Sequence, residues 1–143
     1  MTGARGRVIR PSTIPACERG GGARTSPLVS RASGSTSFMS GLTTFAPGAS
    51  IQLHFHNCEE SVFLLEGRAI AEIDGVAHEV AAGDMSFIPA KVPHRFINAS
   101  ASEEMRILWT YASIDATRTI VATGDTRRIE DEHRAGPATD LPG

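Results

Sequence analysis

The sequence predicts an all-β fold, in which many short strands form a sandwich or a barrel. From Ser35 onward, short segments rich in β-branched, aromatic and leucine residues recur about every ten residues, and Gly, Pro, Asn and Asp separate them. The clearest turn is Asp74-Gly75, which lies between two alternating segments and is typical of a primed hairpin turn, because glycine accepts a positive φ. Short strands at even spacing indicate an all-β domain rather than alternating helices and strands.

The expected strands follow one another through the middle of the chain. They span residues 35–45, 50–56, 61–66, 68–74, 77–81, 84–88, 94–98 and 104–112. The segment from Ser113 to Thr119 is interpreted as a short helix or a turn that leads into residues 120–122.

Composition divides the 143 residues into a central domain and two polar ends. Residues 34–123 are expected to form the barrel. Residues 1–33 are interpreted as an N-terminal extension that is partly ordered or packed on a partner, because glycine, arginine, serine and proline bury little apolar surface. Residues 124–143 are expected to form a polar, frayed C-terminal tail.

Charge and apolar content exclude several classes of partner. The extension carries six arginines and one acidic residue, but no aromatic side chains alternate with them, so we expect no nucleic-acid partner. Apolar runs such as residues 62–65 are far shorter than the roughly 20 residues that span a bilayer, and no secretory signal is recognised. We therefore expect a cytoplasmic protein with no membrane partner, in which Cys17 and Cys58 stay reduced.

Three polar side chains gather around the second expected strand. His54 and His56 lie two residues apart, so both point to the same face of a strand, and Glu60 follows in the next loop. His94 begins a later strand, after a loop that prolines make stiff. Imidazole and carboxylate ligands suit Fe, Mn, Zn, Ni or Cu, so the pattern predicts a site for one divalent transition metal ion.

These residues lie in two segments that resemble the two sequence motifs of the cupin superfamily. Residues 48–67 match the first motif at every position, and residues 83–98 match the second except at Lys91, where the family usually has glycine. Lysine adopts the positive φ of such a turn at a cost of roughly 1 kcal/mol. The resemblance implies a jelly-roll barrel, also called a double-stranded β-helix, whose two antiparallel sheets enclose a metal. It implies that the metal ligands are His54, His56, Glu60 and His94.

A mostly apolar pocket is expected beside this metal. Its predicted walls are Gln52, Val62, Leu64, Phe87 and Phe96. Such a pocket suits a small keto-acid or partly aromatic substrate, and no arginine cluster is expected there to bind a phosphosugar. No general base is recognised outside the ligand set, so Glu60 is the candidate catalytic residue, as a ligand that leaves the metal and accepts a proton.

Other notable side chains are interpreted as structural. Met105, Ile107, Trp109 and Tyr111 alternate along one face of the last expected strand, which favours the barrel core or a subunit interface over a substrate-lining role. His78 and His133 are interpreted as solvated or satisfied by a core hydrogen bond rather than bound to metal, and Cys58 as a residue that fills a loop near the metal.

The sequence leaves two classes of function open. The favoured one is a metal-dependent enzyme that acts on a small organic molecule, with a dioxygenase preferred over a lyase, isomerase or decarboxylase that uses the metal as a Lewis acid. The alternative is a non-catalytic cupin that binds a small molecule. A homodimer is expected, because pairing through edge strands or the N-terminal extension removes exposed strand edges.

Overall fold

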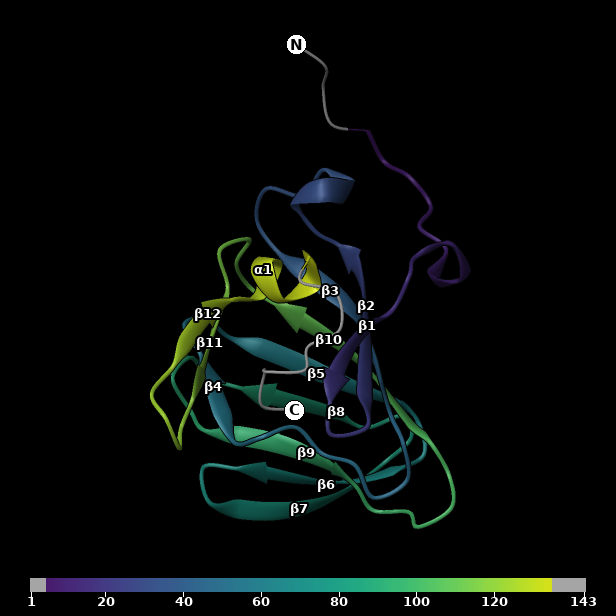
Figure 1. Cartoon of the computed structure of the whole chain (residues 1–143), viewed down its shortest axis with the longest axis vertical. Helices are drawn as coiled ribbons and strands as arrows, with labels where there is room; N and C mark the ends of the chain where they lie inside the picture. Colours follow the sequence, from purple (N-terminus) through teal and green to yellow (C-terminus); the bar gives the residue numbers. More distant parts are fainter. Residues whose placement is uncertain (1–4, 135–143) are drawn as a thin grey trace.

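Two antiparallel six-stranded sheets face each other in the computed structural model, which describes residues 5–134 (Figure 1). In order across the first sheet, the strands are β1 (Cys17–Gly20), β2 (Ala23–Val29), β3 (Met39–Phe45), β10 (Met105–Tyr111), β5 (Glu60–Glu66) and β8 (Met85–Ile88). In order across the second, they are β12 (Thr126–Arg128), β11 (Thr117–Ile120), β4 (His54–His56), β9 (His94–Asn98), β6 (Arg68–Ile73) and β7 (Val76–Ala81). This arrangement confirms the predicted all-β jelly-roll barrel.

The barrel core lies between the sheets, and β10 is at its centre. This strand pairs with β3 on one side and β5 on the other, and its alternate side chains Met105, Ile107, Trp109 and Tyr111 are all buried. The Trp109 indole N–H donates a hydrogen bond to Thr43 Oγ1 at 2.9 Å. Burial of these large side chains is the main favourable term that holds the two sheets together.

Two tight turns match expectations from the sequence. Asp74 (φ 52°) and Gly75 (φ 81°) connect β6 to β7 with two positive φ angles, which confirms the primed hairpin turn. Lys91 adopts φ 69°, so lysine takes the left-handed conformation that glycine usually supplies. Its N–H donates to the carbonyl of His56 at 2.8 Å, and this bond fixes the loop before His94 against β4.

The N-terminal extension folds onto its own barrel. Strand β2 pairs with β3 from Ala23 opposite Phe45 onward, and β1 pairs with β2 as the outer strand. The register shifts between Glu18 and Gly20, and the intervening Arg19 is buried. Preceding residues include the 3₁₀ turn η1 (Pro11–Thr13), and η2 (Arg31–Ser33) follows β2. The homodimer stays a prediction.

The segment after Gly124 forms a strand and a helix, so the prediction of a frayed end is wrong for residues 126–134. Strand β12 pairs with β11, and helix α1 (Ile129–Arg134) lies between β12 and the β2–β3 pair (Figure 1). Ile129 is fully buried, and its N–H donates to the carbonyl of Ala116. One buried apolar residue and one buried acid, Glu132, thus anchor a segment of otherwise polar sequence. Residues 135–143 of the predicted tail lie outside the described residues.

Within residues 5–134, no helix has the length and apolar character needed to cross a membrane.

Gly41 is expected to be essential for the packing of β3 against β10. A Cβ atom at this position would lie 2.6 Å from the carbonyl oxygen of Ser26 and against the ring of Trp109. We expect Gly41→Ala to lower the free energy of unfolding by about 1–3 kcal/mol, because the added methyl forces both neighbours to shift. Urea unfolding followed by circular dichroism measures the change. The control is Gly6→Ala, where the added atom has open space; equal stability of the two variants would contradict this account.

Candidate metal centre

Three histidine rings meet inside the barrel from two neighbouring strands. His54 and His56 project from β4, and His94 projects from β9 directly opposite His54 in the register. The ring centroids lie 4.5–5.1 Å apart, and one ring nitrogen from each histidine lies within 4.8 Å of the others. The same-face geometry of a strand therefore brings the two histidines of β4 together, as the sequence predicts.

Backbone carbonyls orient each of the three rings. Nδ1 of His54 lies 2.6 Å from the carbonyl of Gln52, Nδ1 of His56 lies 2.9 Å from that of Thr117, and Nδ1 of His94 lies 2.9 Å from that of Val92. A carbonyl only accepts hydrogen bonds, so Nδ1 is the protonated nitrogen in all three rings. A ring in its neutral form then has its lone pair on Nε2, which is the arrangement that metal-binding histidines show, whereas Nε2 of His94 needs a second proton to donate to a carboxylate.

Glu60 lies beside the three rings at the start of β5. Its Oε1 is 3.0 Å from Nε2 of His94 and 3.2 Å from Nε2 of His56, and its side chain is 5% exposed. Burial opposes the charged carboxylate, but the charges and hydrogen bonds of the two histidines outweigh it and lower the pKa of Glu60 to about 2. Burial likewise opposes the charged form of His94, but the hydrogen bond and charge of Glu60 raise its pKa.

A divalent cation fits this set of side chains. Nε2 of His56 is buried and has no hydrogen-bond partner among residues 5–134. Burial and the charges of the other two histidines lower the pKa of His54 well below its ordinary value. His54 therefore stays neutral near pH 7 and brings no positive charge of its own to the cluster. Converging lone pairs and a carboxylate need positive charge between them, and imidazole and carboxylate suit the transition metals predicted from the sequence. The three histidines can hold a metal ion; the set of four ligands stays a prediction.

A cavity adjoins the cluster and has aromatic walls. Its lining includes His54, Glu60 and His94, together with Phe45, Phe96, Trp109 and Tyr111. Ile107 also contributes, so three of the four alternating side chains of β10 line the cavity. The interpretation of these side chains as core is correct for their burial, but it missed that the core of this barrel is also the wall of the site. Alternation alone does not distinguish the two roles.

The predicted pocket walls are only partly correct. Phe96 lines the cavity, whereas Val62 and Leu64 are buried in the core away from its walls. Phe87 is 59% exposed, so its assignment as a wall is wrong: at the end of β8, the neighbouring Ile88 faces the core instead. Gln52 is also wrong as a wall, because it precedes β4, its side chain is exposed, and only its carbonyl reaches the site.

Three further side chains reach the cavity from parts of the chain that the sequence left out of the site. They are Arg19 of β1, Arg118 of β11 and His133 of α1. The expectation that no arginine cluster lies near the pocket is therefore wrong. Arg19 follows a shift in strand register that no pattern of apolar residues signals, and His133 belongs to the segment expected to fray.

His133 is a histidine of the cavity wall outside the candidate ligand set. Its ring lies 5.5 Å from that of Trp109 in a stacked arrangement. Burial lowers the pKa of His133 to about 4, and the nearby charge of Arg19 adds to this effect. The ring is therefore neutral near pH 7, and His133 is a half-buried side chain of the cavity wall, a position that the sequence does not predict. His78, by contrast, is exposed on β7 as expected.

Comparison with known proteins gives the family. Residues 41–111 match the family model described as a cupin domain. "Polyketide synthase CurC" of Streptomyces cyaneus is 33% identical over 141 residues, which cover 96% of this chain and 90% of that protein. The chain is a cupin. "Protein SchB" of Streptomyces halstedii is 29% identical over 137 residues, covering 95% of this cupin and 98% of that protein.

Solved structures share the same fold. The polyketide cyclase RemF of Streptomyces resistomycificus aligns with a TM-score of 0.70 at 20% identity, over 87% of this cupin and 86% of that chain. An oxalate oxidase aligns with a TM-score of 0.65 at 20% identity, over 71% of this cupin and 56% of that chain. At these identities the likeness shows the barrel fold and leaves the reaction open.

Replacing single histidines tests the ligand assignment. We expect His54→Ala and His94→Ala each to lower bound metal at least about tenfold, because losing a ligand leaves an incomplete coordination shell. Elemental analysis after dialysis against a metal buffer measures the occupancy, and circular dichroism checks that the barrel still folds. His78→Ala is the matched control, since that side chain is exposed. Full occupancy in either ligand variant would show that the assignment is wrong.

Metal affinity should fall at low pH in a range that His94 sets. Glu60 raises the pKa of His94, so below that pKa the metal-free site holds a proton that an incoming ion must displace. We expect the apparent affinity to be constant above this pKa and to fall about tenfold for each pH unit below it. Competition with a chromophoric chelator over a pH series measures the slope. An affinity independent of pH across that range would contradict the role of the His94–Glu60 pair.

Proposed function

We propose that this cupin is a metal-dependent cyclase that closes a ring in a linear polyketide. The observation that carries the proposal is the meeting of three histidine lone pairs and a carboxylate beside a cavity with aromatic walls. The names of two similar proteins, "Polyketide synthase CurC" and "polyketide cyclase RemF", support a substrate of alternating keto and methylene groups. Such a chain is planar in its enol form and offers paired oxygens for a metal.

The bound ion would supply Lewis acidity, which polarises a carbonyl and makes the neighbouring C–H bonds more acidic. The chain's own residues perform the other tasks of the reaction. The flat faces of Trp109, Tyr111 and Phe96 orient an enolised chain and exclude water from it. Ring closure forms one carbon–carbon bond, and loss of one water molecule then makes the ring aromatic.

A proton acceptor is available in the neutral ring of His133. It lies in the cavity wall and has an unprotonated nitrogen near pH 7, since its pKa is about 4. Glu60, the catalytic candidate from the sequence, is the weaker choice, because its pKa of about 2 and its close contacts with two histidines make it a poor base. We therefore assign proton acceptance to His133 and a metal-holding role to Glu60.

The dioxygenase activity favoured by the sequence is the competing assignment, since the same ligands suit a metal that activates oxygen. A test uses the protein loaded separately with Zn, Mn, Fe(II), Ni or Cu and a linear triketone of seven carbons. We expect loss of water to give orcinol, the aromatic isomer of the dehydrated substrate, without oxygen consumption. Chromatography and an oxygen electrode follow the two quantities together.

The outcomes separate the classes of function. Orcinol formed faster than in the His54→Ala variant, without oxygen uptake, supports the cyclase. Oxygen uptake that matches substrate loss would overturn it in favour of a dioxygenase. Binding of the triketone without turnover by any loaded form would overturn it in favour of a non-catalytic binding protein. The His78→Ala variant should behave as the unmodified protein does.

A further inference from the structure

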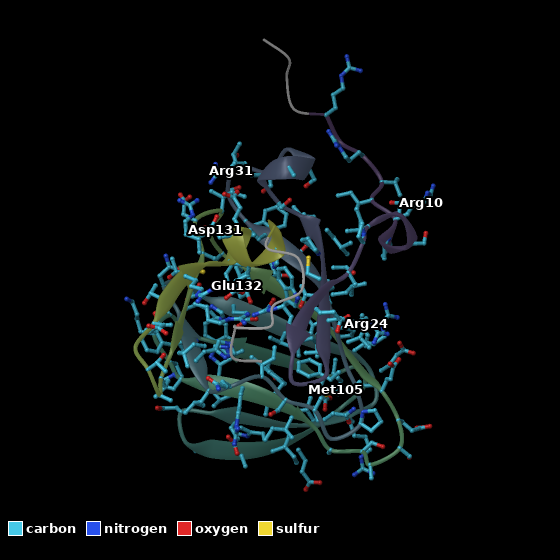
Figure 2. The ribbon with its side chains drawn as sticks, in the orientation of Figure 1. Arg10, Arg24, Arg31, Met105, Asp131 and Glu132 are labelled. Carbon is cyan, nitrogen blue, oxygen red and sulfur yellow. The ribbon has the colours of Figure 1, made fainter. Side chains whose placement is uncertain are left out.

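Two buried arginines and one buried glutamate meet at the wall of the metal-side cavity. Arg19 comes from β1, Arg118 from β11, and Glu132 from α1. Nη2 of Arg19 lies 3.0 Å from Oε1 of Glu132, and Nη1 of Arg118 lies 3.6 Å from the same oxygen. Their side chains are 2%, 5% and 4% exposed. In Figure 2, Glu132 points from α1 toward the barrel, whereas the adjacent Asp131 lies on the outer side.

Arg19 differs from the other arginines of the extension. Arg10, Arg24 and Arg31 lie on the outside of the molecule (Figure 2), where the last two pair with exposed acids. The register shift beside Arg19 is the irregularity of a β-bulge, which redirects a side chain. Its buried side chain is therefore part of the lining of the cavity that His54, Glu60 and His94 also line.

The arginine pair is short of hydrogen-bond acceptors. Nε and Nη2 of Arg19 and Nε and Nη1 of Arg118 are buried and have no hydrogen-bond partner among the described residues. The contact to Glu132 is an ion pair by distance, and both guanidiniums share one carboxylate oxygen. Buried charges of this kind are costly unless their donors are satisfied, and two positive groups against one acid leave a positive excess.

Glu132 is itself poorly stabilised in this position. Burial raises its pKa even though Arg19 lies beside it, and its Oε1 also has no hydrogen-bond partner among residues 5–134. A second carboxylate that offered two oxygens would satisfy the planar donor edges better than this single shared oxygen does.

We propose that Arg19 and Arg118 form a carboxylate-binding subsite for the substrate, which Glu132 fills until the substrate's own carboxylate replaces it. The subsite shares its cavity with His54, Glu60 and His94. A β-keto acid carries a group for each place, a keto oxygen for the side of the histidines and an acid group for the arginines. This inference rests on the proposed function and narrows its substrate to a polyketide that carries a free acid.

Binding of acetoacetate and its neutral analogue acetoacetamide to the full-length, metal-free protein tests the subsite. Without metal, any preference for the acid arises from the protein's own side chains. Fluorescence of Trp109, the chain's single tryptophan and part of the cavity wall, reports binding. We expect Glu132→Gln to bind acetoacetate about tenfold or more tightly than the unmodified protein, because it removes the internal competitor, with acetoacetamide unchanged. A gain in binding cannot come from misfolding.

Two further variants make the test specific. Arg118→Gln added to Glu132→Gln should reverse the gain for acetoacetate. Glu130→Gln is the matched control, because this acid of the same helix pairs outside the cavity with Arg31 and Arg128. Unchanged acetoacetate affinity in Glu132→Gln, or equal preference for acid and amide, would overturn the proposal. Since the assay uses no metal and no turnover, the subsite is judged separately from the cyclase activity.

Discussion

Three hydrogen bonds from histidine Nδ1 atoms to backbone carbonyls determine what this barrel can bind. Each bond places a proton on the outer ring nitrogen, so the inner nitrogen of a neutral ring carries a lone pair that faces the interior. Glu60 adds a carboxylate to the same point. Such a cluster is unfavourable without a positive charge at its centre. Its persistence in a folded core is understandable as a preformed site for a cation, which releases that strain on binding.

Both sheets contribute residues to this cluster and to the cavity beside it. The second sheet provides the histidines and the carbonyl of Thr117 that orients His56, because β11, β4 and β9 lie side by side. The first sheet provides Glu60 and the aromatic walls from β5 and β10. The candidate ligands therefore come from both sheets, and the cavity walls do too, since Phe96 lies on β9 and Trp109 and Tyr111 lie on β10.

The barrel and the histidine cluster were predictable because each depends on local rules. Strand alternation places His54 with His56, and the Asp74-Gly75 turn follows from the conformational freedom of two residues. The walls were less accessible to such reasoning. Gln52 precedes its strand, so alternation does not apply to it. Phe87 lies near the end of the short strand β8, where tertiary packing rather than sequence pattern decides which face of the strand is exposed.

The C-terminal helix and Arg19 were missed for a related reason. Helix α1 is short and almost entirely polar, and one buried isoleucine with one buried acid gives no periodic signal. Arg19 lies among glycines, and its inward direction comes from an irregularity in pairing rather than from a pattern of residues. Both become visible only when β1 and α1 lie together in three dimensions.

The ion pair between Arg19 and Glu132 shows that part of the cavity wall depends on residues outside the two cupin motifs. Both cupin motifs lie between residues 48 and 98, whereas this ion pair joins residues from outside them. The candidate ligands His54, His56, Glu60 and His94 all lie within the motifs, so this part of the cavity wall is built from segments that neither motif includes. Substitutions at Arg19 or Arg118 would therefore change the cavity wall and leave both motifs unaltered.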